Sequence, residues 1–245
     1  MISAEAYLEN ANKYIQCVKE TQFSTIKRIA EILADCITKD GVIHVFGTGH
    51  SKSFAGEMAF RAGGLVPMHA MYLEDLLRKG VESVDDINDL DTERDPKVAH
   101  RLLALYDIRP TDAVILVSNS GRNGSMIEMA MELKSRGLPI ICVTSLEHTK
   151  QVTSRHPSGK KLFEVADYVI DNCGPYGDAL SFPGLETKVC AISSITGILI
   201  AQCLTAEIIN NLTLNNHPIP AYISANVDGA DEHNNALREK YKGRI

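Results

Sequence analysis

Residues 42–58 read VIHVFGTGHSKSFAGEM and carry the strongest indication of the fold. They begin with VIHVF, a β-branched and aromatic run that is typical of a buried strand. This run leads directly into GTGHS, a turn rich in glycine and hydroxyl groups. The next stretch, KSFAGEMAFRA, holds good helix formers and is followed by the helix-ending pair Gly63 and Gly64. The order strand, turn, helix predicts one unit of an α/β fold.

The same order recurs later in the chain. DAVILVS (112–118) predicts a second strand, NSGRN a second turn, and MIEMAMELKSR a helix that stops at Gly137. PIICVT (139–144) and ADYVID (166–171) predict two further strands. Nearly continuous apolar strands that alternate with helices indicate a parallel sheet covered on both faces. We therefore expect a three-layer α/β fold.

The remaining segments are expected to complete a single domain over 1–245, with an N-terminal helical segment (1–40), an α/β core (41–212) and a C-terminal tail (213–245). A helix that ends at Gly41 is predicted by an apolar stripe at spacings of three and four, formed by Ile26, Ile29, Ala30, Leu33 and Ile37.

Two further segments have a distinctive composition. The acidic stretch VESVDDINDLDTERD (81–95) is weakly periodic, and we interpret it as an excursion above the sheet. Residues 188–210 are apolar and rich in small residues, which predicts a long helix buried in the core or in a subunit interface.

The composition limits the possible partners. The chain has 25 Lys and Arg against 31 Asp and Glu, so its net charge is -6, and this argues against a nucleic-acid surface. The six cysteines are scattered without metal or disulfide spacing and indicate reduced packing residues. No signal peptide is apparent, and no apolar run approaches the ~20 residues that cross a membrane. We expect a cytoplasmic protein without a membrane partner.

The two turns have the composition of a phosphate site. Both follow parallel strands, where the first amides of the next helix point into a crevice and favour anions. The expected ligand groups are Gly47, Thr48, Gly49, Ser51 and Ser53 in the first turn and Ser118, Asn119 and Ser120 in the second. Each turn alone is equally well explained as a helix cap. NAD and ATP signatures fit poorly, because Lys52 and Ser51 stand where those motifs need glycine.

In GTGHS and SNSG the sequence resembles the sugar isomerase (SIS) domain family, whose members carry GTGxS and SxSG after two strands. The stretches GTGHSKSFAGEMAFRAGGL, TSLEH, GLETKV and NVDGADEHN resemble a bacterial branch of that family, similar to phosphoheptose isomerase-like proteins. The resemblance implies a flavodoxin-like, five-stranded parallel sheet and a homodimer or homotetramer. It also implies phosphorylated-sugar contacts from Ser51, Ser53, Ser118 and Ser120, and it adds Ser125.

Aldose–ketose isomerisation needs a base that moves a proton between adjacent carbons. Glu57 follows the first turn on its helix, and a solvated surface glutamate is the alternative interpretation. Glu186 resembles in position the base of SIS enzymes that form glucosamine phosphate. The sequence does not decide between them. His50 lies inside the ligand turn and is the candidate for ring opening, whereas His44 lies in an apolar strand and is expected to be a core residue.

The tail contains Asp228, Asp231, Glu232 and His233, whose spacing matches no known metal motif, so we predict no metal. Its aromatic residues predict an ordered tail that packs at a subunit boundary, with His233 contributing to a site. The leading hypothesis is a sugar-phosphate isomerase without a cofactor. A sugar-phosphate lyase or deglycase and a non-catalytic sugar-phosphate sensor remain open alternatives.

Overall fold

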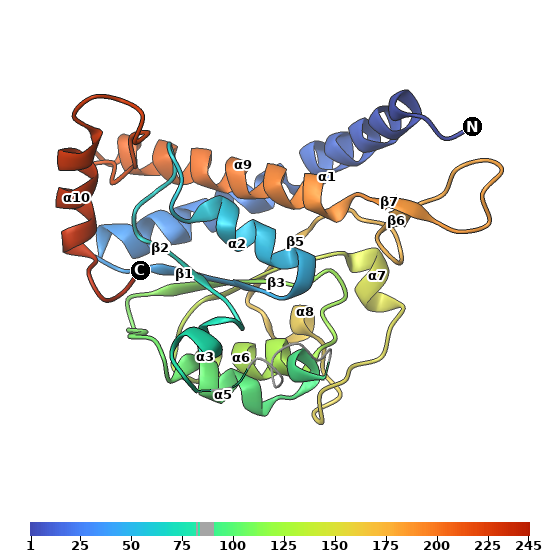
Figure 1. The fold of residues 1–245 in the computed structure, drawn as a ribbon, viewed down its shortest axis with the longest axis horizontal. Coiled ribbons are helices and arrows are strands. Elements are labelled where there is room, and N and C mark those ends of the chain that lie inside the picture. The colour runs from blue at the N-terminus through green and yellow to red at the C-terminus, as the bar shows by residue number, and fades with distance from the viewer. Residues whose placement is uncertain (82, 84–90) are drawn as a thin grey trace.

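The computed structural model describes residues 1–81, 83 and 91–245, and Figure 1 shows three layers. A five-stranded parallel sheet forms the middle layer in the order β2-β1-β3-β4-β5. The strands are β1 (Ile43–Gly47), β2 (Met68–Met71), β3 (Ala113–Val117), β4 (Ile140–Thr144) and β5 (Tyr168–Asp171). The α/β class and the four strands predicted from the sequence are confirmed. The strand β2 was not located from the sequence.

Helices cover both faces of this sheet (Figure 1). One face packs against α1 (Ala4–Thr38), α2 (Lys52–Met58) and α9 (Ser193–Leu214). The other face packs against α3 (Asp75–Arg78), α5 (Lys97–Leu103), α6 (Gly124–Ser135) and α8 (Leu162–Val165). Short pieces complete the described chain: η1 (Gly49–Ser51), η2 (Thr92–Arg94), α7 (Leu146–Lys150), β6 (Ala179–Leu180), β7 (Val189–Ala191) and α10 (Ala230–Lys240).

The first helix forms as its pattern predicts. Its N-cap Ser3 accepts a hydrogen bond from the Ala6 amide, and its apolar stripe is buried against the sheet and α9. The helix ends at Thr38, and Gly41 follows where the backbone passes very close to its neighbours. A Cβ at Gly41 would lie 2.2 Å from the carbonyl oxygen of Thr111, so only glycine fits there.

Two predicted helix boundaries are wrong. The helix expected over 188–210 begins only at Ser193, because Val189–Ala191 pairs with Ala179–Leu180 as an antiparallel hairpin. Local pairing thus overrides an apolar run. The helix after GTGHS ends at Met58, since Ala59 is extended and Phe60 has a φ of +53°.

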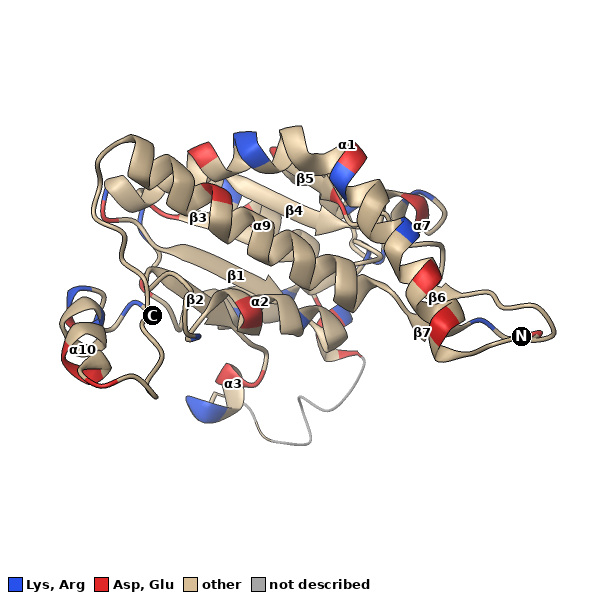
Figure 2. Ribbon diagram, turned by 90° about the horizontal axis from the view of Figure 1, so that it is seen from above, with Lys and Arg blue, Asp and Glu red and all other residues tan. Residues whose placement is uncertain are grey.

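The C-terminal tail is ordered, as expected. It forms α10, which lies beyond the amino ends of the strands, at the opposite end of the molecule from the β6–β7 hairpin (Figures 1 and 2). Tyr241 packs there with Val42 and Val66, and Arg244 is buried. The acidic segment 81–95 lies mostly outside the described residues. Its last part forms η2, which packs against α6.

One helix, α9, is long and apolar enough to cross a membrane by length and composition. This is weak evidence, because α9 packs along α1 and α2 in the core of the domain. Core helices of water-soluble proteins pass the same test.

Candidate functional site

The candidate site lies at the carboxyl ends of β1 and β3, which are neighbours in the sheet. Gly47 at the end of β1 is in register with Val117 at the end of β3. The strand order changes direction between these two strands, since the chain next adds β2 on one side of β1 and β3 on the other. Ligands of open α/β sheets bind at such a switch point. The two turns predicted from the sequence therefore stand side by side.

The first turn needs both of its glycines. A Cβ on Gly47 would lie 2.6 Å from the carbonyl oxygen of Ser51, and Gly49 has a φ of +55°. The tight path places η1 directly after the strand, with the Ser51 amide bonded to the Thr48 carbonyl oxygen at 3.1 Å. Ser53 donates its hydroxyl to the carbonyl oxygen of His50 at 2.8 Å. The side chains of His50 and Ser53 remain exposed.

The second turn is more buried and internally bonded. The Ser118 hydroxyl accepts a hydrogen bond from the Gly121 amide at 3.1 Å, and Ser118 is 7% exposed. The Asn119 side-chain oxygen accepts a hydrogen bond from the Asn172 amide group at 2.9 Å. Ser120 is half-buried beside them. Ser118 thus holds the turn in shape, while Asn119 lines the cavity.

The N-terminus of α9 adds a third polar element. Asp178 accepts hydrogen bonds from the Ser193 amide at 2.8 Å and the Ser193 hydroxyl at 2.6 Å. Together the three elements enclose a cavity of about 20 Å³, which is room for about one water molecule. A larger ligand must therefore lie above this floor. The lining consists of His50, Ser51, Ser53, Phe54, Val117, Asn119, Val143, Asn172, Ser193, Ser194 and Gly197.

The structure brings His50, Ser51, Ser53 and Asn119 together around one cavity, as the two-turn prediction requires. Gly47, Thr48, Gly49, Ser118 and Ser120 lie in the same two turns. Among the described residues, no Lys or Arg lines this cavity, so its hydrogen-bond donors are hydroxyls, amides and the His50 ring. In the described part of the chain, no group of three His, Cys, Asp or Glu side chains is placed to hold a metal ion.

Neither glutamate proposed as a base lines the cavity. Glu57 is paired with Arg61 one turn away and accepts a hydrogen bond from Gln202 of α9 at 2.6 Å. Glu186 is exposed in the loop of the β6–β7 hairpin, which projects beside the N-terminal half of α1 (Figure 1). Within one chain, neither carboxylate therefore belongs to the lining of this cavity.

Two further predicted residues lie elsewhere. Ser125 is fully buried on α6 and donates its hydroxyl to the Glu93 carbonyl oxygen at 2.6 Å, so this hydroxyl is already used. His233 lies on α10 beyond the opposite end of the sheet, with its Nε2 3.0 Å from the Ala221 carbonyl oxygen. Within one chain α10 packs over the amino ends of the strands (Figure 1), so a contribution of His233 to a site at a subunit boundary stays a prediction.

The sequence analysis missed Asn172, Ser193 and Ser194. Asn172 follows the end of β5 directly, which is the same signal that identified the two turns. The serines were missed because the segment from residue 188 was interpreted as one packed helix. The β7 strand shows that Ser193 and Ser194 begin that helix and place its N-terminus at the cavity.

Comparison with known proteins gives consistent matches. The family model described as SIS domain matches residues 6–145. A UPF0309 protein of Caldanaerobacter subterraneus is 39% identical over 98% of both chains. A phosphoheptose isomerase from Francisella tularensis superposes with a TM-score of 0.55 at 16% identity, over 83% of this chain and 95% of that one. The Vibrio vulnificus NanR protein complexed with ManNAc-6P gives 0.50 at 16%, over 86% and 64%.

Proposed function

Because the chain belongs to the SIS domain family, we propose that it binds a phosphorylated sugar at the carboxyl ends of β1 and β3 and isomerises it. The observation that carries this proposal is the convergence of His50, Ser51 and Asn119 with the N-terminus of α9 on one cavity. The fold neighbours support it, since one is a phosphoheptose isomerase and another is complexed with ManNAc-6P. We place this activity in the cytoplasm and in a homo-oligomer.

The phosphate is held by neutral donors in this proposal. Hydroxyls of Ser51 and Ser120 and the first amides of α2 point toward an anion above the cavity floor, and the helix dipole favours its negative charge. A hydrogen bond to a charged group makes a net contribution of about 1.5–3 kcal/mol. A cavity floor whose described lining contains no Lys or Arg suits a small ligand that must leave again after turnover.

The proposed reaction is an aldose–ketose isomerisation. A base removes the proton from C2 of the open-chain aldose, the resulting enediol forms between C1 and C2, and a proton returns to C1 while the C2 oxygen becomes the carbonyl. His50 is the titratable side chain in the described lining of the cavity, and its side chain is exposed to solvent. We assign it the proton transfer, in place of Glu57 and Glu186.

A second candidate function, binding of a sugar phosphate without catalysis, is favoured by the absence of a carboxylate from the described lining of the cavity. No Asp or Glu lines the described part of the cavity, whereas carboxylates are common bases for such chemistry. A protein that binds the sugar phosphate and releases it unchanged needs no base. A lyase or deglycase would start with the same proton abstraction and is distinguished from an isomerase by its products.

The experiment combines binding and product analysis. Ser51→Ala with Ser120→Ala removes two hydroxyls, whereas Ser135→Ala with Ser158→Ala removes two exposed hydroxyls far from the cavity and serves as control. Thermal-shift titration with glucose 6-phosphate, glucosamine 6-phosphate and sedoheptulose 7-phosphate should show a loss of roughly 1–3 kcal/mol of binding for the first pair alone. Equal affinity in both pairs would remove the proposed site.

Turnover is followed by NMR of the sugar carbons in the wild type and in His50→Gln. Isomerisation predicts exchange of the C2 proton with solvent and appearance of the ketose, and both should fall by a factor of roughly 100 or more in His50→Gln while affinity is kept. Binding with no product and no exchange in the wild type would support the sensor instead.

A further inference from the structure

A much larger cavity lies at the outer edge of β2, away from the two turns. Its volume is about 630 Å³, within the range of small-molecule sites, about 300–1,000 Å³. It lies between the end of α2, the edge strand β2, α3, the segment after α5 and the C-terminal residues. The side chains that matter for recognition are His69, Lys79, Tyr106 and Arg244.

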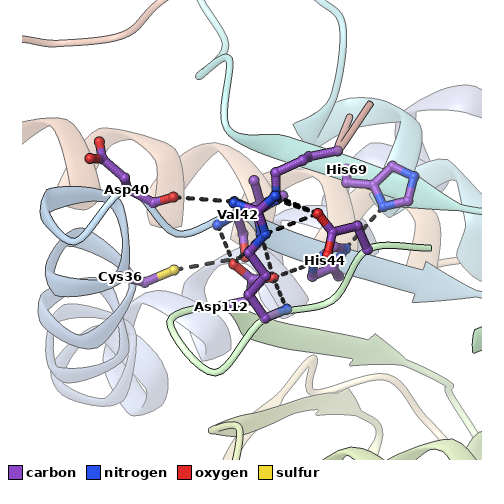
Figure 3. A network of polar contacts seen from close by, with 9 residues as sticks. Cys36, Asp40, Val42, His44, His69 and Asp112 are labelled. Carbon is purple, nitrogen blue, oxygen red and sulfur yellow. Dashed lines mark hydrogen bonds and ion pairs between the residues drawn. The ribbon is translucent and has the colours of Figure 1, made fainter. Parts of the chain in front are cut away.

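A chain of buried hydrogen bonds leads from Asp112 to this cavity (Figure 3). His44 Nε2 lies 3.0 Å from the Asp112 carboxylate, and His44 Nδ1 lies 2.9 Å from His69 Nδ1. Asp112 also accepts hydrogen bonds from Arg244 at 2.7 Å. Burial would raise the pKa of Asp112, but the bonds from His44, the backbone and Arg244 lower it to about 2. Asp112, the first group in this series of hydrogen bonds, is therefore an ionised carboxylate.

This order of bonds fixes the proton positions. A carboxylate only accepts hydrogen bonds, so His44 must donate from Nε2. His44 is fully buried, and the charge of Arg244 already balances that of Asp112. A second buried cation would be unfavourable, so the His44 ring is neutral and its Nδ1 accepts a hydrogen bond. His69 must then donate from Nδ1. Its own Nε2, which faces away from His44 in Figure 3, is left without a proton. Burial and the neighbouring His44 lower the pKa of His69 to about 4, which keeps the ring neutral.

The cavity is also lined by two positively charged side chains. Lys79 lines it and makes no ion pair with any residue that the structure describes. Arg244 is 7% exposed, and its Nε has no hydrogen-bond partner among the described residues. The two acidic residues of the lining are engaged, Asp75 with Arg78 and Tyr106, and Asp107 with Arg109 and, at 3.7 Å, with Arg244 Nε.

We propose that this cavity is a second binding site, for a small hydroxylated anion such as a sugar phosphate. A hydroxyl of the ligand donates to His69 Nε2, and its anionic group lies against Lys79 and Arg244 Nε. The rings of Phe60, Tyr72 and Tyr106 give the cavity apolar faces for the carbon skeleton. The site is separate from the crevice at the carboxyl ends of β1 and β3 and does not depend on its function.

The test reads the imidazole directly, with ¹H–¹⁵N spectra of the histidine side chains of the full chain. The wild type should show an unprotonated Nε2 on His69 at neutral pH. Its signal should shift on addition of at least one of glucose 6-phosphate, ribose 5-phosphate and glucosamine 6-phosphate at millimolar concentration. A protonated Nε2, or no shift with any of the three, overturns the proposal.

Variants separate this site from the crevice. Lys79→Met should weaken the ligand affinity measured from the His69 signal about tenfold, because one hydrogen bond to a charged group is lost. Lys97→Met, at an exposed position of α5, should leave this affinity unchanged. His69→Asn keeps a donor toward His44, removes the Nε2 acceptor and should abolish saturable binding at this cavity. Ser51→Ala with Ser120→Ala should leave the His69 response intact. If that pair abolishes the response, the ligand sits in the crevice and the second site is excluded.

Discussion

The two cavities hold polar groups in different ways. At the carboxyl ends of β1 and β3, hydroxyls and amides surround a space of about 20 Å³. The residues that carry them lie in turns or at a helix start, except Asn172, which directly follows β5. At the edge of β2, a space of about 630 Å³ is backed by ionised groups buried in the core. The first arrangement draws on short separate segments around Ser51, Asn119, Asn172 and Ser193, whereas the second is one hydrogen-bonded network that joins residues as distant as His44 and Arg244. Removing groups should therefore affect mainly binding in the first case and mainly stability in the second.

The largest expected effect comes from Asp112→Ala. Asp112 has no exposed side-chain surface and accepts hydrogen bonds from the Val42 amide, the Arg109 amide and Arg244. Its removal leaves the buried Arg244 with only the half-exposed Asp107 carboxylate, 3.7 Å from its Nε, as an ion-pair partner, so urea denaturation should show a loss of about 3–5 kcal/mol in unfolding free energy.

Asp167→Ala is the matched control. Asp167 also precedes a strand and accepts a hydrogen bond, at 3.0 Å, from the first amide of the neighbouring strand, at Ile140. Its side chain is 31% exposed and pairs with Lys134 at the surface. Its loss should cost only about 1 kcal/mol. Similar losses of unfolding free energy in the two variants would mean that burial does not increase the contribution of Asp112 to stability.

The next effect is a pH dependence of stability. The pKa of His69 falls from an ordinary value of 6.5 to about 4 in the folded chain. Between these values the unfolded chain binds a proton that the folded chain does not. Unfolding free energy should therefore fall as pH falls from 6.5 toward 4, by at most about 3 kcal/mol from this residue. In His69→Asn this part of the pH profile should become flatter, and an unchanged profile would contradict the assignment.

The smallest effects compare two glycines of the first turn. In Gly47→Ala the new Cβ meets the Ser51 backbone at 2.6 Å, so the turn must move, with a loss of about 1–3 kcal/mol in stability and of ligand affinity. Gly49→Ala meets nothing within 4 Å and is strained only by its φ of +55°, which costs about 1 kcal/mol. Thermal melting and sugar-phosphate titration measure both. Equal affinities would show that the close approach at Gly47 does not shape the site.

The sequence predicted most of the fold because its core strands are apolar on both faces. The strands at 112–118 and 139–144 are bounded by clear turn signals and proved correct within a residue or two. β2 was missed because MHAM contains a histidine and lies between a proline and a tyrosine, without a continuous apolar run. The β6–β7 hairpin was missed because its strands are very short and are joined by a long loop without a recognisable tight-turn signal.

The sequence predicted the site unevenly for a physical reason. Ser51 and Asn119 lie in the turns that follow β1 and β3, so their place at the carboxyl end of the sheet follows from chain direction alone. Glu57 and Glu186 were placed by resemblance and spacing, which cannot show that Arg61 and Gln202 already hold the Glu57 carboxylate. The cavity at β2 has no motif, because His69, Tyr106 and Arg244 come from three distant segments that meet only in the folded chain.

The packing of α1 along α9 has a consequence for the order of events during synthesis. The apolar stripe of α1, with Ile29 and Leu33, is buried partly against α9. The ribosome completes α1 at Thr38 but reaches α9 only at Ser193, and it adds about 5–20 residues per second. Contacts between such distant segments form late. The nascent chain therefore carries an unburied α1 stripe for many seconds, and the first helix to be made is among the last to find its partner.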